Sequence, residues 1–188
     1  MSVRAPAARW RPSDLWRTLA GLGVVLGFTA LVLDGLDAAP AWILGEPRDV
    51  RLVPTVAEAE RRLGARLFLP GYFPDTIEWP PSAVRIRRGP VPGAALSFDG
   101  RRGGPYMQLG QAVRPGDVPD RLMPAIRPLD EAPIWIAGQQ ARLRRFTGPD
   151  GQVWRELTWR TKGRQLVLRS RGTVEEMVRM ARTSRDEP

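Results

Sequence analysis

Residues 141–171 read ARLRRFTGPDGQVWRELTWRTKGRQLVLRSR, and this stretch sets the fold class. It contains three short candidate strands, at 141–146, 153–159 and 165–171. The two turns between them are Pro149-Asp150-Gly151 and Lys162-Gly163. Connections this short that contain glycine and aspartate are typical of β-hairpins. The stretch therefore predicts three neighbouring antiparallel strands.

Side chains alternate between the two faces of a strand, so the same stretch also predicts which residues share a face. Trp154, Glu156 and Thr158 fall on one face of 153–159, opposite Val153, Arg155, Leu157 and Trp159. Glu156 is the only carboxylate in the middle of a predicted strand, beside the arginine-rich run 141–145. We interpret it as one half of a cross-strand ion pair and not as a catalytic acid.

Turn residues divide the preceding chain into four further candidate strands: Ala83–Arg88, Ala94–Phe98, Tyr106–Gln111 and Ile134–Ile136. Thr-x-x-Glu capping boxes at Thr55 and Thr173 predict two short helices, one over 56–63 and one following Thr173. Residues 67–74 are apolar but contain two prolines, which favours an extended, buried segment. The prediction is an α+β domain with a mainly antiparallel sheet and two short helices.

An apolar run of fifteen residues, Leu19–Leu33, follows four arginines and precedes Asp34 and Asp37. Because basic residues resist translocation, this pattern predicts a single-pass membrane segment with its N-terminus inside and the C-terminal domain outside the bacterial cytoplasmic membrane. The anchor is assigned to these residues: Trp16, Arg17, Leu19, Leu33 and Trp42. The predicted organisation is a basic cytoplasmic N-terminus (1–17), an anchor or signal segment (18–44), a linker (45–54) and an extracytoplasmic domain (55–188).

The alternative is export followed by cleavage of the N-terminal segment. The run is short for a span that needs about 20 residues, and Ala39-Pro40-Ala41 resembles the small-x-small site of a signal peptidase. The sequence leaves both alternatives open.

The composition limits the chemical groups that a functional site could use. The 188 residues contain no cysteine and no histidine, which excludes thiolate nucleophiles, histidine-based triads and zinc-finger sites. Most remaining carboxylates lie in turns beside glycine or proline. The sequence therefore predicts a protein that is not an enzyme, with no cofactor and no metal site.

The net charge of +9 is confined to residues 47–188, because residues 1–46 contain four arginines and four acidic residues. Alternation places Arg85 with Arg87, and Arg142 with Arg144, on a strand face, so these four are the candidate binding residues for an anionic partner. The expected partners are the bilayer and either another membrane protein, an anionic lipid or a cell-wall polymer. Nucleic acid is not expected outside the cytoplasm.

The order of segments resembles a known family. Leu69, Pro70 and Pro74 match its Leu-Pro-x-x-x-Pro turn, and Ile136, Gly138 and Ala141 match a hairpin of small residues. Later positions match the strand pair and the final helix of the same family: Trp159, Gly163, Leu168, Glu175, Glu176, Val178, Ala181 and Ser184. Over residues 53–185 the chain resembles the extracytoplasmic C-terminal domain of unknown function of bacterial anti-sigma-factor and sporulation proteins.

This resemblance implies an architecture related to the outer-membrane lipoprotein carriers, with a curved, half-barrel-like sheet and helices on its concave side. Sigma-factor inhibition is not implied, because about 17 cytoplasmic residues are too few for a zinc-binding inhibitory domain and contain no zinc ligand. We therefore expect a binding module that acts as a sensor, a regulator or an accessory subunit of a membrane complex. The alternative is a carrier that holds a lipid or lipoprotein acyl chain on the concave sheet face.

Overall fold

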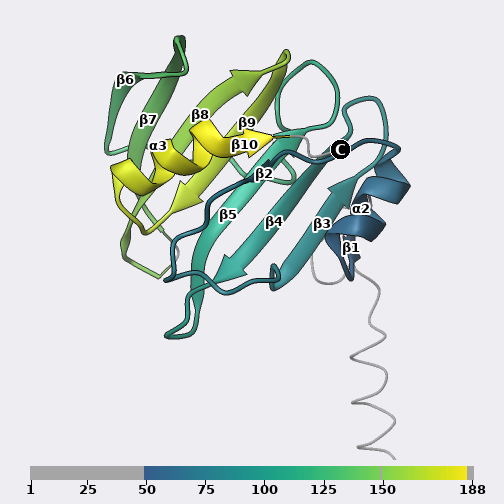
Figure 1. The fold of residues 1–188 in the computed structure, drawn as a ribbon, viewed down its shortest axis with the longest axis horizontal. Coiled ribbons are helices and arrows are strands. Elements are labelled where there is room, and N and C mark those ends of the chain that lie inside the picture. The colour runs from purple at the N-terminus through teal and green to yellow at the C-terminus, as the bar shows by residue number, and fades with distance from the viewer. Residues whose placement is uncertain (1–48, 149, 186–188) are drawn as a thin grey trace, which may run out of the picture. The chain divides into compact units, whose positions relative to one another are not determined.

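The computed structural model describes residues 49–148 and 150–185, which form an α+β domain around one antiparallel sheet of eight strands. The sheet is open, and its edges are the first and sixth strands (Figure 1). In spatial order the strands are β1 (Val50–Val53), β3 (Ala83–Arg87), β4 (Gly93–Asp99), β5 (Pro105–Ala112), β9 (Arg164–Ser170), β8 (Val153–Thr161), β7 (Gln139–Thr147) and β6 (Asp130–Ile136). The predicted α+β class and the mainly antiparallel pairing of the sheet are confirmed.

Both predicted helices form, and their caps explain their limits. The helix α2 (Val56–Leu63) starts after Thr55, whose side chain accepts the Glu58 N–H, and ends at Gly64 with φ 65°. The helix α3 (Val174–Thr183) starts with a complete capping box between Thr173 and Glu176. These contacts satisfy N–H groups that have no partner within the helix.

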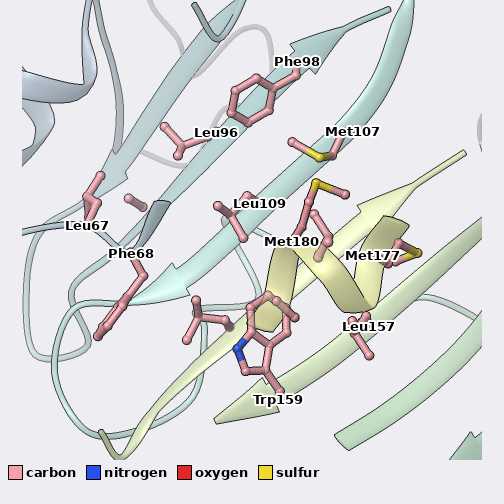
Figure 2. Packing of buried hydrophobic residues seen from close by; sticks show 14 of the residues in the cluster. Leu67, Phe68, Leu96, Phe98, Met107, Leu109, Leu157, Trp159, Met177 and Met180 are labelled. Carbon is pink, nitrogen blue, oxygen red and sulfur yellow. The ribbon is translucent and has the colours of Figure 1, made fainter. Parts of the chain in front are cut away.

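The main core lies on one face of the sheet. A row of directly opposed residues crosses six strands there: Leu143, Leu157, Leu168, Leu109, Leu96 and Val84. The apolar stripe of α3 packs on this row through Met177 and Met180, both at most 1% exposed (Figure 2). Phe68, from the predicted buried segment, belongs to the same cluster. A short pair of strands, β2 (Leu69–Pro70) and β10 (Ser184–Arg185), joins that segment to the end of α3.

The second face is partly covered by the long connection between β5 and β6. Val118, Leu122 and Met123 of this connection pack on Ala95 and Val167. A close approach is possible because Gly110 has no side chain: a Cβ there would lie 2.3 Å from Met123 Cγ. The sheet therefore has a small second core between its surface and this connection.

Two predictions of element boundaries are wrong. Residues 50–53 of the predicted linker 45–54 form β1, because Val53 pairs with Val84 and is buried in the main core. The strand predicted over 134–136 begins at Asp130, and Pro133 lies inside it. Proline is tolerated there because β6 is an edge strand.

The predicted membrane segment, 18–44, lies outside the described residues, and so do Trp16, Arg17, Leu19, Leu33 and Trp42. Within residues 49–148 and 150–185, no helix is both long and apolar enough to cross a bilayer.

Candidate binding site

A row of alternating charges crosses the second face of the sheet. Glu131 on β6 lies opposite Arg144 on β7, Arg144 lies opposite Glu156 on β8, and Glu156 lies opposite Arg169 on β9. We call these four residues the charge row. Directly opposed side chains on one sheet face lie within reach of one another, so four strands hold the row by their register alone.

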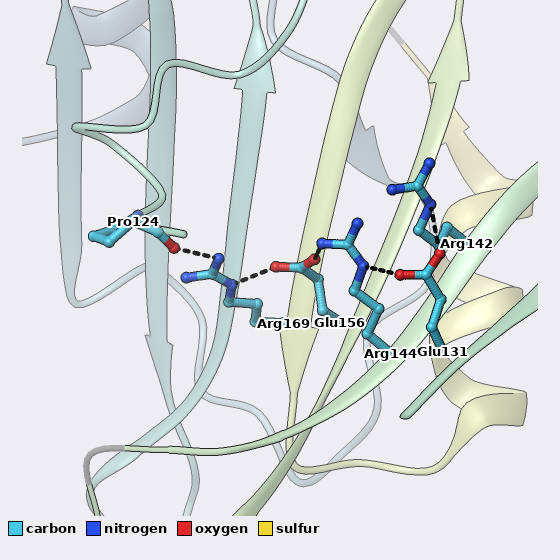
Figure 3. Close-up of polar contacts among 6 residues, drawn as sticks. All are labelled: Pro124, Glu131, Arg142, Arg144, Glu156 and Arg169. Carbon is cyan, nitrogen blue, oxygen red and sulfur yellow. Dashed lines mark hydrogen bonds and ion pairs between the residues drawn. The ribbon is translucent and has the colours of Figure 1, made fainter. Parts of the chain in front are cut away.

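The ion pairs of the row are continuous (Figure 3). Arg169 Nε donates to Glu156 Oε2 at 2.8 Å, and Arg144 Nη1 donates to Glu156 Oε1 at 3.4 Å. Arg144 Nε donates to Glu131 Oε2 at 2.8 Å, and Arg142 Nε lies 3.2 Å from Glu131 Oε1. Each carboxylate is therefore shared by two guanidinium groups.

The inner half of the row is buried. Glu156 is 3% exposed and Arg169 is 7% exposed. Arg169 also donates to the Pro124 carbonyl oxygen at 2.7 Å and lies over the ring of Phe146. A buried charge is tolerated only when it is paired and hydrogen-bonded, and this one meets both conditions. Glu156 is thereby a structural carboxylate whose two oxygens are both occupied.

A cavity of ≈ 540 Å³ lies between the charge row and the connection that covers the second face. Its floor comprises Thr158, Gln165 and Val167 from β8 and β9. Its roof is formed by Val118, Met123 and Ile126 from the β5–β6 connection. The charged residues of the lining are four arginines and three acidic residues: Arg142, Arg144, Arg160, Arg169, Asp120, Glu131 and Glu156. The cavity is polar with a net positive lining.

Two of these arginines are accessible. The Arg142 side chain is 55% exposed and pairs with Glu131, which is 46% exposed. The Arg160 side chain is 52% exposed and pairs with Asp117, which is 69% exposed. Exposed ion pairs of this kind contribute only about 0–1 kcal/mol, so either carboxylate can be exchanged for an anion from solution at small cost. Arg142 and Arg160 are therefore the cavity arginines most accessible to an anion in solution.

The four arginines predicted from the sequence separate into two pairs. Arg85 and Arg142 share one row of the second face, but β4, β5, β9 and β8 lie between their strands, a separation of about 24 Å at 4.8 Å per strand. Only Arg142 and Arg144 line the cavity. Arg85 makes no ion pair with the described residues.

Arg87 belongs to a different ion pair. Its Nε donates to Asp49 Oδ2 at 2.5 Å, and Arg121 Nη1 donates to Asp49 Oδ1 at 2.9 Å. Hydrogen bonds from Arg87 and Arg121 lower the pKa of Asp49 from 3.8 to about 2. This pair fixes the start of β1 and lies away from the cavity.

Sequence reasoning missed Arg160 and Arg169. The signal for Arg169 was present, because alternation along 165–171 places it opposite Leu166 and Leu168, on the face of Val167. The same alternation along 153–161 places Arg160 on the face of Glu156 and Thr158, where it lines the cavity and pairs with Asp117.

The described residues contain no group of three or more acidic side chains that could hold a metal ion. The polar groups of the site are guanidinium, carboxylate, amide and hydroxyl groups, and the guanidinium, amide N–H and hydroxyl groups can donate hydrogen bonds to an anion.

Searches with the sequence and the structure against family models, curated proteins and solved structures return no match for this chain.

Proposed function

We propose that this chain is a membrane-anchored extracytoplasmic binding module, without enzymatic activity, that recognises an anionic group of its partner in the cavity beside the charge row. In this role it acts as a sensor, a regulator or an accessory subunit of a membrane complex. The observation that carries the proposal is the combination of a buried Glu156–Arg169 pair with two accessible arginines, Arg142 and Arg160, at one polar cavity.

The buried part of the row supports binding by pre-organising the site. Arg144 is held between Glu131 and Glu156, and Arg169 is held between Glu156 and the Pro124 carbonyl. Side chains that are fixed before binding lose little conformational entropy when a ligand arrives. Guanidinium groups also match carboxylate and phosphate geometry, so these two anions are the chemical class that we propose.

The same geometry gives no support to general acid or base chemistry. Both oxygens of Glu156 already accept hydrogen bonds from arginine, and Glu131 is likewise shared. An acyl-chain carrier also finds no favouring observation, because α3 and Phe68 fill the core face of the sheet. The cavity on the other face is lined by charged and polar groups.

Binding is tested by following arginine Nε–Hε NMR signals of the full chain in a zwitterionic detergent during titration with inorganic phosphate. We expect saturable shifts at Arg142 and Arg160. In the variant R142Q/R160Q the remaining cavity arginines, Arg144 and Arg169, should show no saturable shifts. The matched variant R101Q/R102Q, changed in an exposed hairpin, should behave like the original chain. Shifts of equal size at every exposed arginine, without saturation, would show simple charge screening and refute the proposal.

Membrane topology is tested separately, and the absence of cysteine makes the test direct. Ser2→Cys and Gln152→Cys variants are treated with a membrane-impermeant thiol reagent in intact bacteria. We expect labelling of the Gln152 variant in intact cells and of the Ser2 variant only after permeabilisation. The reverse pattern would refute an extracytoplasmic module.

A further inference from the structure

The two ends of the sheet differ in charge. One end, which we call the entry end, is where the described chain begins at Asp49, beside Arg87. The connections at this end span residues 87–93, 113–121, 136–139 and 160–164. The opposite end, which we call the far end, is formed by these segments: 75–82, 99–105, 147–153 and 170–173.

The entry end is more basic than the far end. Its four connections contain seven basic and two acidic residues, whereas the four segments of the far end contain three basic and four acidic residues. An arginine-rich composition alone would raise the number of basic residues at both ends equally. The difference is therefore a feature of this fold.

Several cations of the entry end are available to a partner. Arg51 and Arg114 are exposed, and their side chains make no hydrogen bond or ion pair with the described residues. Arg160 and Arg121 are more than half exposed, and each pairs with a single exposed or half-exposed carboxylate. Apolar side chains accompany them, because Val91 is 43% exposed and Leu52 is 70% exposed.

We infer that the entry end docks on a bilayer surface rich in anionic phospholipid headgroups. The inference rests on the retained anchor of the proposed function. At most fifteen residues, 34–48, lie between the predicted anchor and Asp49, and only residues 45–48 do so if the anchor extends to residue 44. A random coil of fifteen residues has a root-mean-square span of about 20 Å, so the proposed anchor would hold the entry end, where the described chain begins, nearer the headgroups than the far end.

A lipid surface fits these charges better than an acidic protein does. The four available cations come from β1 and from two separate connections, and only Arg160 among them lines the cavity, so their arrangement suits a flat, laterally mobile array of phosphates. Attraction to such a surface decays over about 8–10 Å at physiological salt, so a domain held near it is oriented by whichever end is basic. Docking would hold the sheet upright with its far end directed away from the membrane.

The test uses the full chain reconstituted in vesicles of phosphatidylcholine alone or mixed with phosphatidylglycerol. Single cysteines at Pro90, in the entry end, or at Gln152, in the far end, carry a fluorescent donor, and the lipid headgroups carry an acceptor. We expect energy transfer from position 90 to rise in the anionic vesicles and to return to the phosphatidylcholine value at high salt. Transfer from position 152 should change little.

Matched charge reversals decide whether the entry end is responsible. R51E/R114E should abolish the rise at position 90, and R101E/R102E, with the same change in net charge at the far end, should preserve it. Equal transfer in the two kinds of vesicle, or equal loss in the two double variants, would overturn docking. Alkaline carbonate extraction of the same vesicles reports the anchor, so a chain that stays in the membrane without orienting refutes docking alone.

Discussion

The side chain of Gln111 on β5 pairs with both main-chain polar groups of Phe68. The Phe68 N–H donates to Gln111 Oε1 at 2.7 Å, and Gln111 Nε2 donates to the Phe68 carbonyl oxygen at 3.2 Å. Phe68 is 1% exposed and Gln111 is fully buried. A buried peptide group needs such partners, and here a side-chain amide supplies what a neighbouring strand would otherwise supply.

Replacing Gln111 by leucine should lower the free energy of unfolding by about 1–3 kcal/mol, because two buried main-chain groups lose their partners. Urea unfolding followed by tryptophan fluorescence measures this change. Gln152→Ala, in the exposed β7–β8 turn, is the control and should stay within about 0.5 kcal/mol of the original chain. An unchanged unfolding midpoint for Gln111→Leu would contradict the structural role of the amide.

Removing Glu156 should destabilise the domain strongly. The change Glu156→Ala leaves Arg169, which is 7% exposed, without its carboxylate, and breaking a buried pair in this way costs about 3–5 kcal/mol. Glu131→Ala removes an exposed carboxylate and should cost about 1 kcal/mol or less. The ratio of these two effects, measured by chemical unfolding, is the check, and equal effects would argue against a buried pair.

A double replacement separates burial from charge. Glu156→Leu together with Arg169→Leu should be more stable than Glu156→Ala alone, since apolar residues of similar volume often substitute well for a buried ion pair. If the double variant is the less stable of the two, the pair contributes more than mutual neutralisation.

The turn between β6 and β7 offers a stabilising change. Ala137 has φ 48° and Gly138 has φ 79°, a pair of left-handed conformations typical of two-residue hairpin turns. Alanine is strained in this region, whereas asparagine tolerates it. Ala137→Asn should raise the free energy of unfolding by about 1 kcal/mol in thermal unfolding, and the same exchange at Ala125, in the β5–β6 connection, should not.

Most of the charge row could be predicted from the sequence, because hairpin turns fix strand register. The two-residue turn Lys162-Gly163 makes Thr161 and Arg164 opposite partners, and counting outward places Arg169 opposite Glu156. The predicted ion pair between Glu156 and the 141–145 run is confirmed as Arg144. Local turn geometry thus accounts for most of the row.

The cavity could not be predicted from the sequence, because its roof depends on contacts between distant segments. The pairing of β5 with β9 and the path of residues 113–129 across the second face leave no periodic pattern in the sequence. The strand β1 was missed for a related reason. Four residues between Asp49 and Pro54 are too few to show alternation, and their partner β3 is thirty residues or more away.

The roof of the cavity should depend on the glycine beneath it. A Cβ at Gly110 would meet Met123 Cγ at 2.3 Å and Val118 Cγ1 at 3.3 Å, so Gly110→Ala forces the connection away from the sheet. Overpacking of this kind costs about 1–3 kcal/mol. We expect faster amide exchange at Leu122 and Met123, and weaker phosphate shifts at the cavity arginines. Gly103→Ala, where a Cβ meets nothing within 4 Å although φ is 85°, is the control for backbone strain alone.

The titration of Asp49 should report the arginines at the start of β1. Hydrogen bonds from Arg87 and Arg121 hold its pKa at about 2, below the ordinary 3.8. A carboxyl group with a lowered pKa stabilises the fold above its unfolded pKa, and this contribution is lost as the pH falls from about 4 towards 2. Carboxyl-carbon NMR should show this low titration point. Arg87→Gln should raise the pKa of Asp49 more than Arg121→Gln, and an ordinary pKa in the original chain would contradict the pairing.

The single junction between β5 and β9 divides the sheet into two blocks that are each continuous in sequence. Residues 49–112 build β1, β3, β4 and β5, and residues 130–170 build β6 to β9. Every other strand pairing of the eight-stranded sheet lies inside one block. A chain cut within 113–129 would therefore yield two pieces with complementary exposed edges, and their reassociation, with α3 laid over the seam, would restore the native sheet as a two-part assembly.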